Sequence, residues 1–441
     1  MKKPVYEEQN YQERFDVRYE ELSWLYMEFY RDETYLRELF QEMHRYSKSK
    51  AGENGFAELD MAYVSILHEW AQKETDYFIT STDEKIPQLF RRGGYLGNFL
   101  YYPEKRKYVM TDQGTDQWNL NYRNPRVFQA MVGKLLEYTQ KGNGILLLKN
   151  LPYIWKELGT DCFDRPEVHK LLRMLRLIVE VVCPEAELWA MLDLESEKAA
   201  AYLGSEEWPE CHRIVRIGDA EVLWHTLATR DVRLLKHQTE RLADYPLKEE
   251  LVHMLWDGCE IRWRLDYQAL REWGMDETAH RSYLNDYFAG LSNGKWSITS
   301  MCGLEKAVEN GDEKWQSCAR RQIFLLYAFL YIVPGVPVIQ VNDQENLRKL
   351  PELRAREKVL GEAAVFRTMD TGENAVLCVV REYENEKLIG LFNFSEHDKM
   401  AWIDERDGLY QDLLSGEYIR TAGTLIPGYG CYWLKKRKEL P

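Results

Sequence analysis

The sequence predicts an α/β fold with a separate β-rich C-terminal part, on three observations. Residues 145–148 form a short, continuous run of β-prone apolar side chains, which is typical of a parallel strand buried on both faces. Amphipathic helices are predicted before it, starting at Asn124-Pro125, and after it, at 166–182, which gives the helix–strand–helix order of an α/β unit. From residue 360 onward the pattern changes to short alternating strands, such as 375–380 and 388–394.

Residues 1–50 are predicted to form an N-terminal helical region. Apolar side chains recur there with helical period and leave charges on the opposite face; they are Tyr11, Phe15, Leu22, Tyr26 and Phe29. A second helix is expected at about 34–46, and the polar, glycine-containing segment that follows is a linker.

Chain length, net charge and aromatic content limit the classes of function that the protein can have. A chain of 441 residues can bury a large core and suggests two or three domains. The net charge of −14 argues against a nucleic-acid partner, because phosphates favour a basic surface. The abundant Trp and Tyr residues suit stacking on sugar rings, although core packing explains an aromatic excess more often.

The sequence predicts a cytoplasmic protein without a metal, a cofactor or a membrane partner. Its eight cysteines show no CxxC pair, which is typical of buried thiols in a reducing compartment. His68, His212, His225 and His253 lack the spacing of metal ligands. The N-terminus lacks the apolar core of a signal peptide, and the most apolar segment, 323–341, is interrupted by prolines at 334 and 337.

Three segments carry a family resemblance: QWNLNYRNP at 117–125, PYIWK at 152–156 and LGT at 158–160. They resemble the amylosucrase branch of the α-amylase superfamily of glycoside hydrolases. The resemblance implies that the strand at 145–149 is the fourth of a (β/α)8 barrel, with the catalytic nucleophile at its end. The family's catalytic positions then fall on Lys149, Leu192 and Cys259.

The same alignment implies an incomplete TIM-type barrel. The family's third-strand motif falls on Glu58, Ala62 and Tyr63, and only a short linker separates this segment from the N-terminal helices, so the first two barrel strands are missing. We expect an open sheet of about six strands in a domain at 51–355, with inserted segments at 71–120 and 265–315. A C-terminal antiparallel β-sandwich is expected at 359–441. The open sheet edges require cover by the N-terminal helices, by a second copy of the chain in a homodimer, or by an active paralogue.

These replacements predict a catalytically impaired or inactive protein. Retaining glycosidases need two carboxyl groups about 5 Å apart, which lysine, leucine and cysteine do not supply. The leading hypothesis is therefore a binding or scaffold protein related to carbohydrate metabolism, for an α-glucan or an α-glucoside. Lys149 is expected to pair with Glu58, Asp193 or Glu260, since an isolated buried cation is costly.

Two alternatives stay open. In the first, Asp193, Glu195 or Glu260 replaces the lost carboxylates in an active glycosidase or glucosyltransferase acting on α-glucosides such as sucrose, although a one-residue step along a strand turns a side chain to the opposite face. In the second, Lys149 serves as the amine of a lysine-dependent enzyme. The candidate sugar-binding aromatics are Tyr63, Trp118 and Tyr153.

Overall fold

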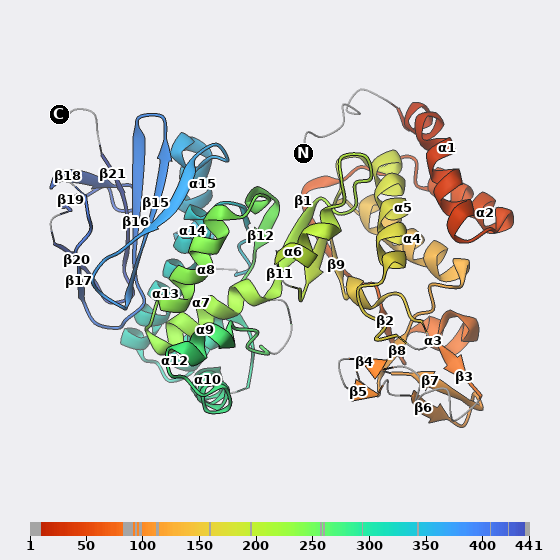
Figure 1. Cartoon of the computed structure of the whole chain (residues 1–441), viewed down its shortest axis with the longest axis horizontal. Coiled ribbons are helices and arrows are strands. Elements are labelled where there is room, and N and C mark those ends of the chain that lie inside the picture. The colour runs from red at the N-terminus through yellow and green to blue at the C-terminus, as the bar shows by residue number, and fades with distance from the viewer. Residues whose placement is uncertain are drawn as a thin grey trace. The chain divides into compact units, whose positions relative to one another are not determined.

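The computed structural model describes residues 10–82, 91–92, 95–96, 99–111, 114–157, 160–194, 196–255, 258, 261–292, 294–341, 344–405, 407–421 and 423–436. The chain divides into two compact units, Met1–Val215 and Arg216–Pro441 (Figure 1). Within the described ranges, no helix is long and apolar enough to cross a membrane.

The parallel sheet is an incomplete barrel, as predicted. Among the described residues it has six strands in the order β1-β9-β10-β11-β12-β13. Their bounds are Gly52–Asp60, Asn143–Lys149, Glu187–Leu192, Arg213–Arg216, Leu251–His253 and Val336–Pro337. The pairs β1–β9, β9–β10 and β12–β13 are parallel. The order ends at β1 and β13, so the sheet does not close into a ring in the part of the chain that the structure describes.

Strand β1 begins with a bulge that depends on glycine. The register with β9 shifts between Gly52 and Phe56, and the two backbones approach closely there. A Cβ atom added at Gly55 would lie 2.1 Å from the carbonyl oxygen of Gly142. The strand then runs in regular register to Asp60 and leaves the sheet. It therefore ends before Ala62 and Tyr63, two of the positions on which the resemblance places the family's third-strand motif. Tyr63–Ser65 instead forms β2, which pairs antiparallel with β8, Gln117–Asn119.

The N-terminal helices form an outer layer over the helices of the sheet. α1 (Tyr11–Phe29) begins with a capping box between Asn10 and Glu13, and α2 (Glu33–Arg45) is capped by the Asp32 side chain. α1 packs on α5 (Pro166–Val182) and α2 on α4 (Pro125–Gln140), an arrangement visible in Figure 1. This corrects the expectation that these helices cover the sheet edge. The reason lies in α5, which is buried nearly all round and so needs a partner on its outer side as well.

The segment between β2 and β8 carries the remaining small elements of the first unit. They are α3 (Glu69–Lys73), β3 (Thr80–Ser81), β4 (Arg91–Arg92), β5 (Tyr95–Leu96), β6 (Phe99–Tyr102) and β7 (Lys107–Met110). After β10 comes the short helix α6 (Ser196–Ala200).

The second unit is mainly helical before its C-terminal strands. Its helices are α7 (Ile217–Thr229), α8 (Arg233–Asp244), α9 (Tyr267–Glu272), α10 (Glu277–Ser292), α11 (Ile298–Met301), α12 (Leu304–Glu309), α13 (Glu313–Ile332), α14 (Gln344–Leu347) and α15 (Lys349–Arg356). The fully buried rings of Trp224, Trp263 and Phe288 pack together at the centre of this part.

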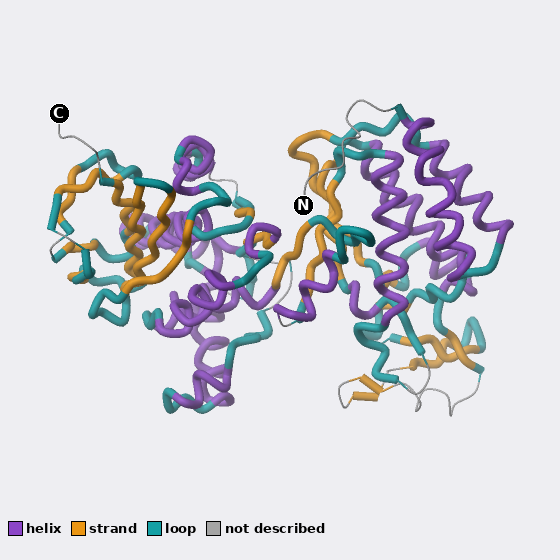
Figure 2. The backbone as a smooth tube through the Cα atoms, turned by 45° about the horizontal axis from the view of Figure 1, so that its top comes forward, coloured by secondary structure: helices purple, strands orange, loops and turns teal. Residues whose placement is uncertain are grey.

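The C-terminal strands form an antiparallel sheet and a two-stranded ribbon, and Figure 2 shows the sheet strands side by side. The sheet order is β14-β15-β16-β21-β18-β19, with bounds Val365–Met369, Val376–Tyr383, Glu386–Asn393, Cys431–Lys435, Leu409–Asp412 and Tyr418–Arg420. The ribbon pairs β17 (Lys399–Ala401) with β20 (Thr424–Ile426).

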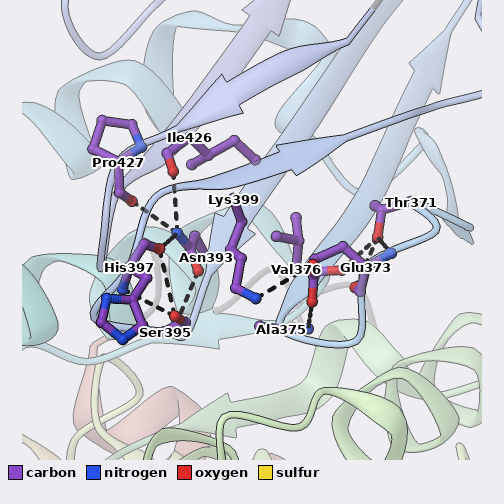
Figure 3. Close-up of polar contacts among 10 residues, drawn as sticks. All are labelled: Thr371, Glu373, Ala375, Val376, Asn393, Ser395, His397, Lys399, Ile426 and Pro427. Atoms are coloured by element: carbon purple, nitrogen blue, oxygen red, sulfur yellow. Dashed lines mark hydrogen bonds and ion pairs between the residues drawn. The ribbon is translucent and has the colours of Figure 1, made fainter.

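One buried asparagine joins the ribbon to the sheet (Figure 3). The Asn393 amide nitrogen at the end of β16 reaches the carbonyl oxygens of His397, Ile426 and Pro427 at 2.8, 3.1 and 3.0 Å. Its side-chain oxygen accepts from the Ser395 amide. Buried amides are stable only when bonded in this way, which explains why an asparagine lies inside an otherwise apolar run.

A buried histidine pair connects α7 to α10. The rings of His225 and His280 lie 5.0 Å apart at 63°, and the Tyr267 ring lies 5.9 Å from His280. Within the described residues neither imidazole has a hydrogen-bond partner. Burial and the facing His280 lower the pKa of His225 to about 3, against a smaller opposite effect of Asp231, and burial and Arg281 lower the pKa of His280.

We predict that the second unit loses stability in mild acid because of this pair. The unfolded chain takes up protons near the usual histidine pKa of about 6.5, whereas folded His225 does so only near 3. The stabilisation is therefore complete above the unfolded pKa and is lost as pH falls from there toward 3. Urea unfolding at pH 7 and pH 4.5 should show a smaller acid loss for His225→Phe than for wild type. The exposed His397→Asn is the matched control and should behave as wild type. Equal acid losses in wild type and His225→Phe would contradict the assignment.

Candidate active site at the strand ends

Lys149 lies at the carboxyl end of β9, where barrel enzymes place their active sites. The parallel register aligns it with Asp60 and aligns Leu147 with Glu58. Its Nζ lies 2.9 Å from Oε2 of Glu58, with side chains 20% and 42% exposed. The predicted ion pair between Lys149 and Glu58 is therefore present. Lys149, on which the resemblance places the family's nucleophile, is thus a cation that a carboxylate of the neighbouring strand binds.

Asp60 is a second carboxylate at these strand ends, and sequence reasoning missed it. Its Oδ1 accepts the backbone amides of Ala62 and Tyr63, both at 3.0 Å, and its Oδ2 accepts the Asn150 side chain at 2.9 Å. Burial raises the pKa of Asp60, while these hydrogen bonds and Lys149 act in the opposite direction. The signal in the sequence was an aspartate at a strand end followed by a turn, which it closes by bonding the amides two and three residues on.

Asn150 shows how the chain leaves β9. It has a φ of +59°, a left-handed conformation that asparagine tolerates better than most residues. Its side chain donates to Asp60, so β1 and the loop after β9 are tied together. The turn Leu151–Tyr153 follows directly.

The register separates Leu192 from Lys149. Leu188 pairs with Leu146 and Ala190 with Leu148, so Leu192 continues the face that carries Leu146 and Leu148. Lys149 lies on the opposite face. If the register is continued by one residue beyond the pair Ala190–Leu148, Lys149 aligns with Met191. Leu192 is 1% exposed. Leu192 is therefore a core side chain of the other face rather than a group opposite Lys149.

Asp193 lies just beyond the end of β10 and is exposed. The sequence argument against Asp193 was that it lies one residue after Leu192 and so points to the opposite face. The register weakens this argument, because Asp193 lies two residues after Met191, and Met191 is on the same face as Lys149. Three further residues that the sequence analysis named for the catalytic site lie outside the described residues: Cys259, Glu260 and Glu195.

The three candidate sugar-binding aromatics differ in exposure. Trp118 is 3% exposed and packs against the rings of Phe78 and Tyr102 at 5.1 and 4.7 Å. Tyr63 is also 3% exposed. Neither ring therefore presents a face to a ligand in this structure. Tyr153 remains partly exposed and stays a candidate.

The ammonium group of a buried lysine lies over the rings of Tyr153 and Tyr63. Lys156 is 5% exposed, and its Nζ lies 5.7 Å from the Tyr63 ring and 5.9 Å from the Tyr153 ring. Arg123 donates its Nε to the Lys156 carbonyl at 3.2 Å and lies 4.8 Å over the Trp155 ring. The segments that carry the family resemblance thus hold the loop after β9 in place.

The described residues show no metal centre. No group of three or more His, Cys, Asp or Glu side chains within them could hold a metal ion. The histidine nitrogens instead bond backbone atoms: His68 and His212 accept the amides of Trp70 and Leu188, and His253 bonds the Pro334 carbonyl.

The carboxylates at the described strand ends already have partners within the protein. Glu58 is held by Lys149, and Asp60 is held by three donors. A nucleophile and a general acid must both be free to meet the glycosidic bond. Lys149 and Leu192 provide neither a carboxylate nucleophile nor a carboxylic general acid.

The chain was compared with known proteins, and no family model matches it. It is 27% identical to glucosylglycerate phosphorylase of Escherichia coli over 415 residues, covering 82% of this chain and 73% of that protein. A glucosylglycerate phosphorylase of Spirochaeta thermophila is 30% identical over 31% of this chain, but only 23% of that protein is covered. A trehalose synthase/amylase of Mycolicibacterium smegmatis is 23% identical over 68% of this chain and 50% of that protein.

Solved structures show the same fold. Sucrose 6F-phosphate phosphorylase from Thermoanaerobacter thermosaccharolyticum aligns with a TM-score of 0.52 and 15% identity over 87% of this chain and 84% of that chain. An α-amylase from H. orenii aligns with a TM-score of 0.52 and 12% identity, over 86% of this chain and 79% of that chain.

We predict that Lys149 and Glu58 are energetically coupled by a modest amount. Because Glu58 is largely exposed, the coupling should be about 0.2–1 kcal/mol and should shrink in high salt. Urea unfolding of wild type, Lys149→Met, Glu58→Gln and the double variant measures it as a double-mutant cycle. The exposed helix pair Lys73–Glu69 provides a reference cycle. A coupling of zero at low salt would show that the contact does not persist in solution.

Proposed function

We propose that the chain is a member of the α-amylase superfamily that has lost the two-carboxylate reaction and binds an α-glucoside or α-glucan without cleaving it. The observation that carries the proposal is the Lys149–Glu58 ion pair at the position of the family's nucleophile. A positive charge there opposes the oxocarbenium-like transition state, which a nearby carboxylate has to stabilise.

The proposed ligand follows from the relatives' names. They are named for glucosylglycerate, trehalose and sucrose 6F-phosphate, which are all glucosyl compounds. We infer that the strand ends around Tyr153 still accept a glucosyl unit. An active paralogue or a second copy of the chain, set against the open edge of β1, is the partner that a scaffold role implies.

A second candidate function is an active glucosyl-transferring or hydrolysing enzyme with a relocated carboxylate. The strand register favours Asp193 for this role. Side chains alternate between the two faces of the sheet, and Asp193 is two residues after Met191, which lies on the same face as Lys149, whereas Leu192 lies on the other face. The lysine-dependent alternative has less support, since an ammonium group held by Glu58 has no lone pair for attack on a carbonyl.

We predict no turnover of sucrose, maltooligosaccharides or nitrophenyl glucosides, and none of glucosylglycerate with inorganic phosphate. Calorimetry with maltotriose should still show binding, which Tyr153→Ala weakens. Lys149→Asp should remain inactive, because residue 192 is still an apolar side chain on the opposite face.

The alternatives give different results in the same assays. Turnover that Asp193→Asn abolishes would replace the binding proposal with the relocated carboxylate. Trapping of Lys149 by borohydride with a carbonyl compound would favour the lysine-dependent enzyme. An absence of both turnover and binding would contradict an α-glucoside ligand.

A further inference from the structure

Two tryptophans lie together on the surface of the first unit, away from the strand ends. Trp24 of α1 is 55% exposed, and Trp208, in the loop before β11, is partly exposed. Their ring centroids are 5.9 Å apart, and the ring planes are tilted by 34°. Tryptophan is enriched at interfaces, so adjoining tryptophan rings at the surface make this place a candidate binding surface.

The anchoring of α1 does not require Trp24. Leu22 and Tyr26, both 1% exposed, already fix the buried face of the helix. Arg14 adds a buried hydrogen bond from its Nε to the Val181 carbonyl at 2.9 Å. If Trp24 served only to hold α1 in place, burial of its ring would be expected.

The loop that carries Trp208 is preorganised. Ser205 and Trp208 exchange hydrogen bonds, with the Trp208 amide donating to Ser205 Oγ at 3.0 Å and the Ser205 amide to the Trp208 carbonyl at 3.1 Å. Gly204 has a φ of +72°, and a Cβ there would lie 2.2 Å from the Trp208 carbonyl oxygen. The loop therefore presents Trp208 in one fixed place, which lowers the entropy lost on binding.

A buried carboxylate fixes a polar neighbour beside the rings. Arg173 of α5 lies with its Cζ 6.0 Å from the centre of the Trp208 ring. Its Nε bonds Oε1 of Glu210 at 3.2 Å, and Glu210 is 1% exposed and also binds His169 at 2.7 Å. The guanidinium is thus held over the Trp208 ring, and its side chain remains 33% exposed.

We propose that Trp24, Trp208 and Arg173 form an aromatic platform that binds a linear α-glucan, a second carbohydrate site in addition to the strand ends. The choice of a glucan rests on the proposed function. Tryptophan faces stack on the apolar faces of pyranose rings, and two tilted rings follow the curvature between successive units of an α-linked chain.

Size favours this occupant over a macromolecular partner. The two basic side chains beside the rings already hold carboxylates, Arg173 that of Glu210 and Lys170 that of Glu28, both at 3.2 Å. This pairing disfavours an acidic ligand. Two rings are also far smaller than the roughly 800 Å² per partner that a stable protein interface requires, but they match one or two sugar units.

The test is retention of the full-length protein in native gels that contain amylopectin, together with calorimetry on maltoheptaose. Trp24→Ala and Trp208→Ala should each weaken binding by about three- to tenfold, the range that one stacked ring contributes. Trp208→Phe should restore part of the affinity. Trp315→Ala is the matched control, because Trp315 is 53% exposed on α13 and should bind as wild type. Thermal unfolding of each variant verifies the fold.

Several outcomes would overturn the platform. They are binding by Trp24→Ala and Trp208→Ala equal to wild type, or no retention of the wild type by the glucan. A change of oligomeric state in these variants with unchanged glucan retention would reassign the surface to protein association. Tyr153→Ala separates the two sites: if it alters neither ligand while Trp24→Ala weakens amylopectin binding, the strand-end proposal fails and the platform stands.

Discussion

A parallel sheet is stable only when both of its faces are covered, and this constraint explains the layers of the first unit. The strand β9 is apolar on both sides, with Leu146, Leu147 and Leu148 at or below 1% exposure. The helices α4 and α5 cover the sheet, and α5 is itself apolar nearly all round. Such a helix requires a second partner, which α1 supplies. The N-terminal helices therefore belong to the third layer of the unit rather than to the edge of its sheet.

The same constraint acts on the charges at the strand ends. Lys149, Glu58 and Asp60 lie where a barrel enzyme would bind its substrate, yet each is bonded within the protein. The face that carries them is less completely covered than the opposite one, since Phe56 and Glu58 are 38% and 42% exposed. This exposure fits a sheet that lacks two of the strands of a complete barrel. Internal pairing keeps these charges compatible with the fold.

Much of the architecture could be predicted from the sequence, because it depends on local patterns. The buried strand at 143–149, the helices on either side of it and the change to antiparallel strands after residue 360 all follow from periodicity and from proline and asparagine positions. The partner of Lys149 was predictable from the cost of an isolated cation. Which face a strand residue occupies was not predictable, because it depends on register: the resemblance put a catalytic position of the family on Leu192, but the pairing of its strand places this side chain on the face opposite to that of Lys149. Asp60 was missed because its role is fixed by the turn that follows it and by Asn150, ninety residues later in the chain.

The pattern of similarity to the superfamily has a structural explanation. The segments that resemble it are those that pack: Trp118 lies between Phe78 and Tyr102, Arg123 covers Trp155, and the Trp155 ring meets Phe29 of α1 at 5.4 Å. Their replacement would leave cavities or unpaired polar groups and lower the stability of the fold. The packing of the fold depends less on Lys149 and Glu58 at the strand ends, because these two side chains pair with one another and are partly exposed to solvent. Packing therefore constrains the flanking residues closely, whereas it places little constraint on the side chains at the strand ends.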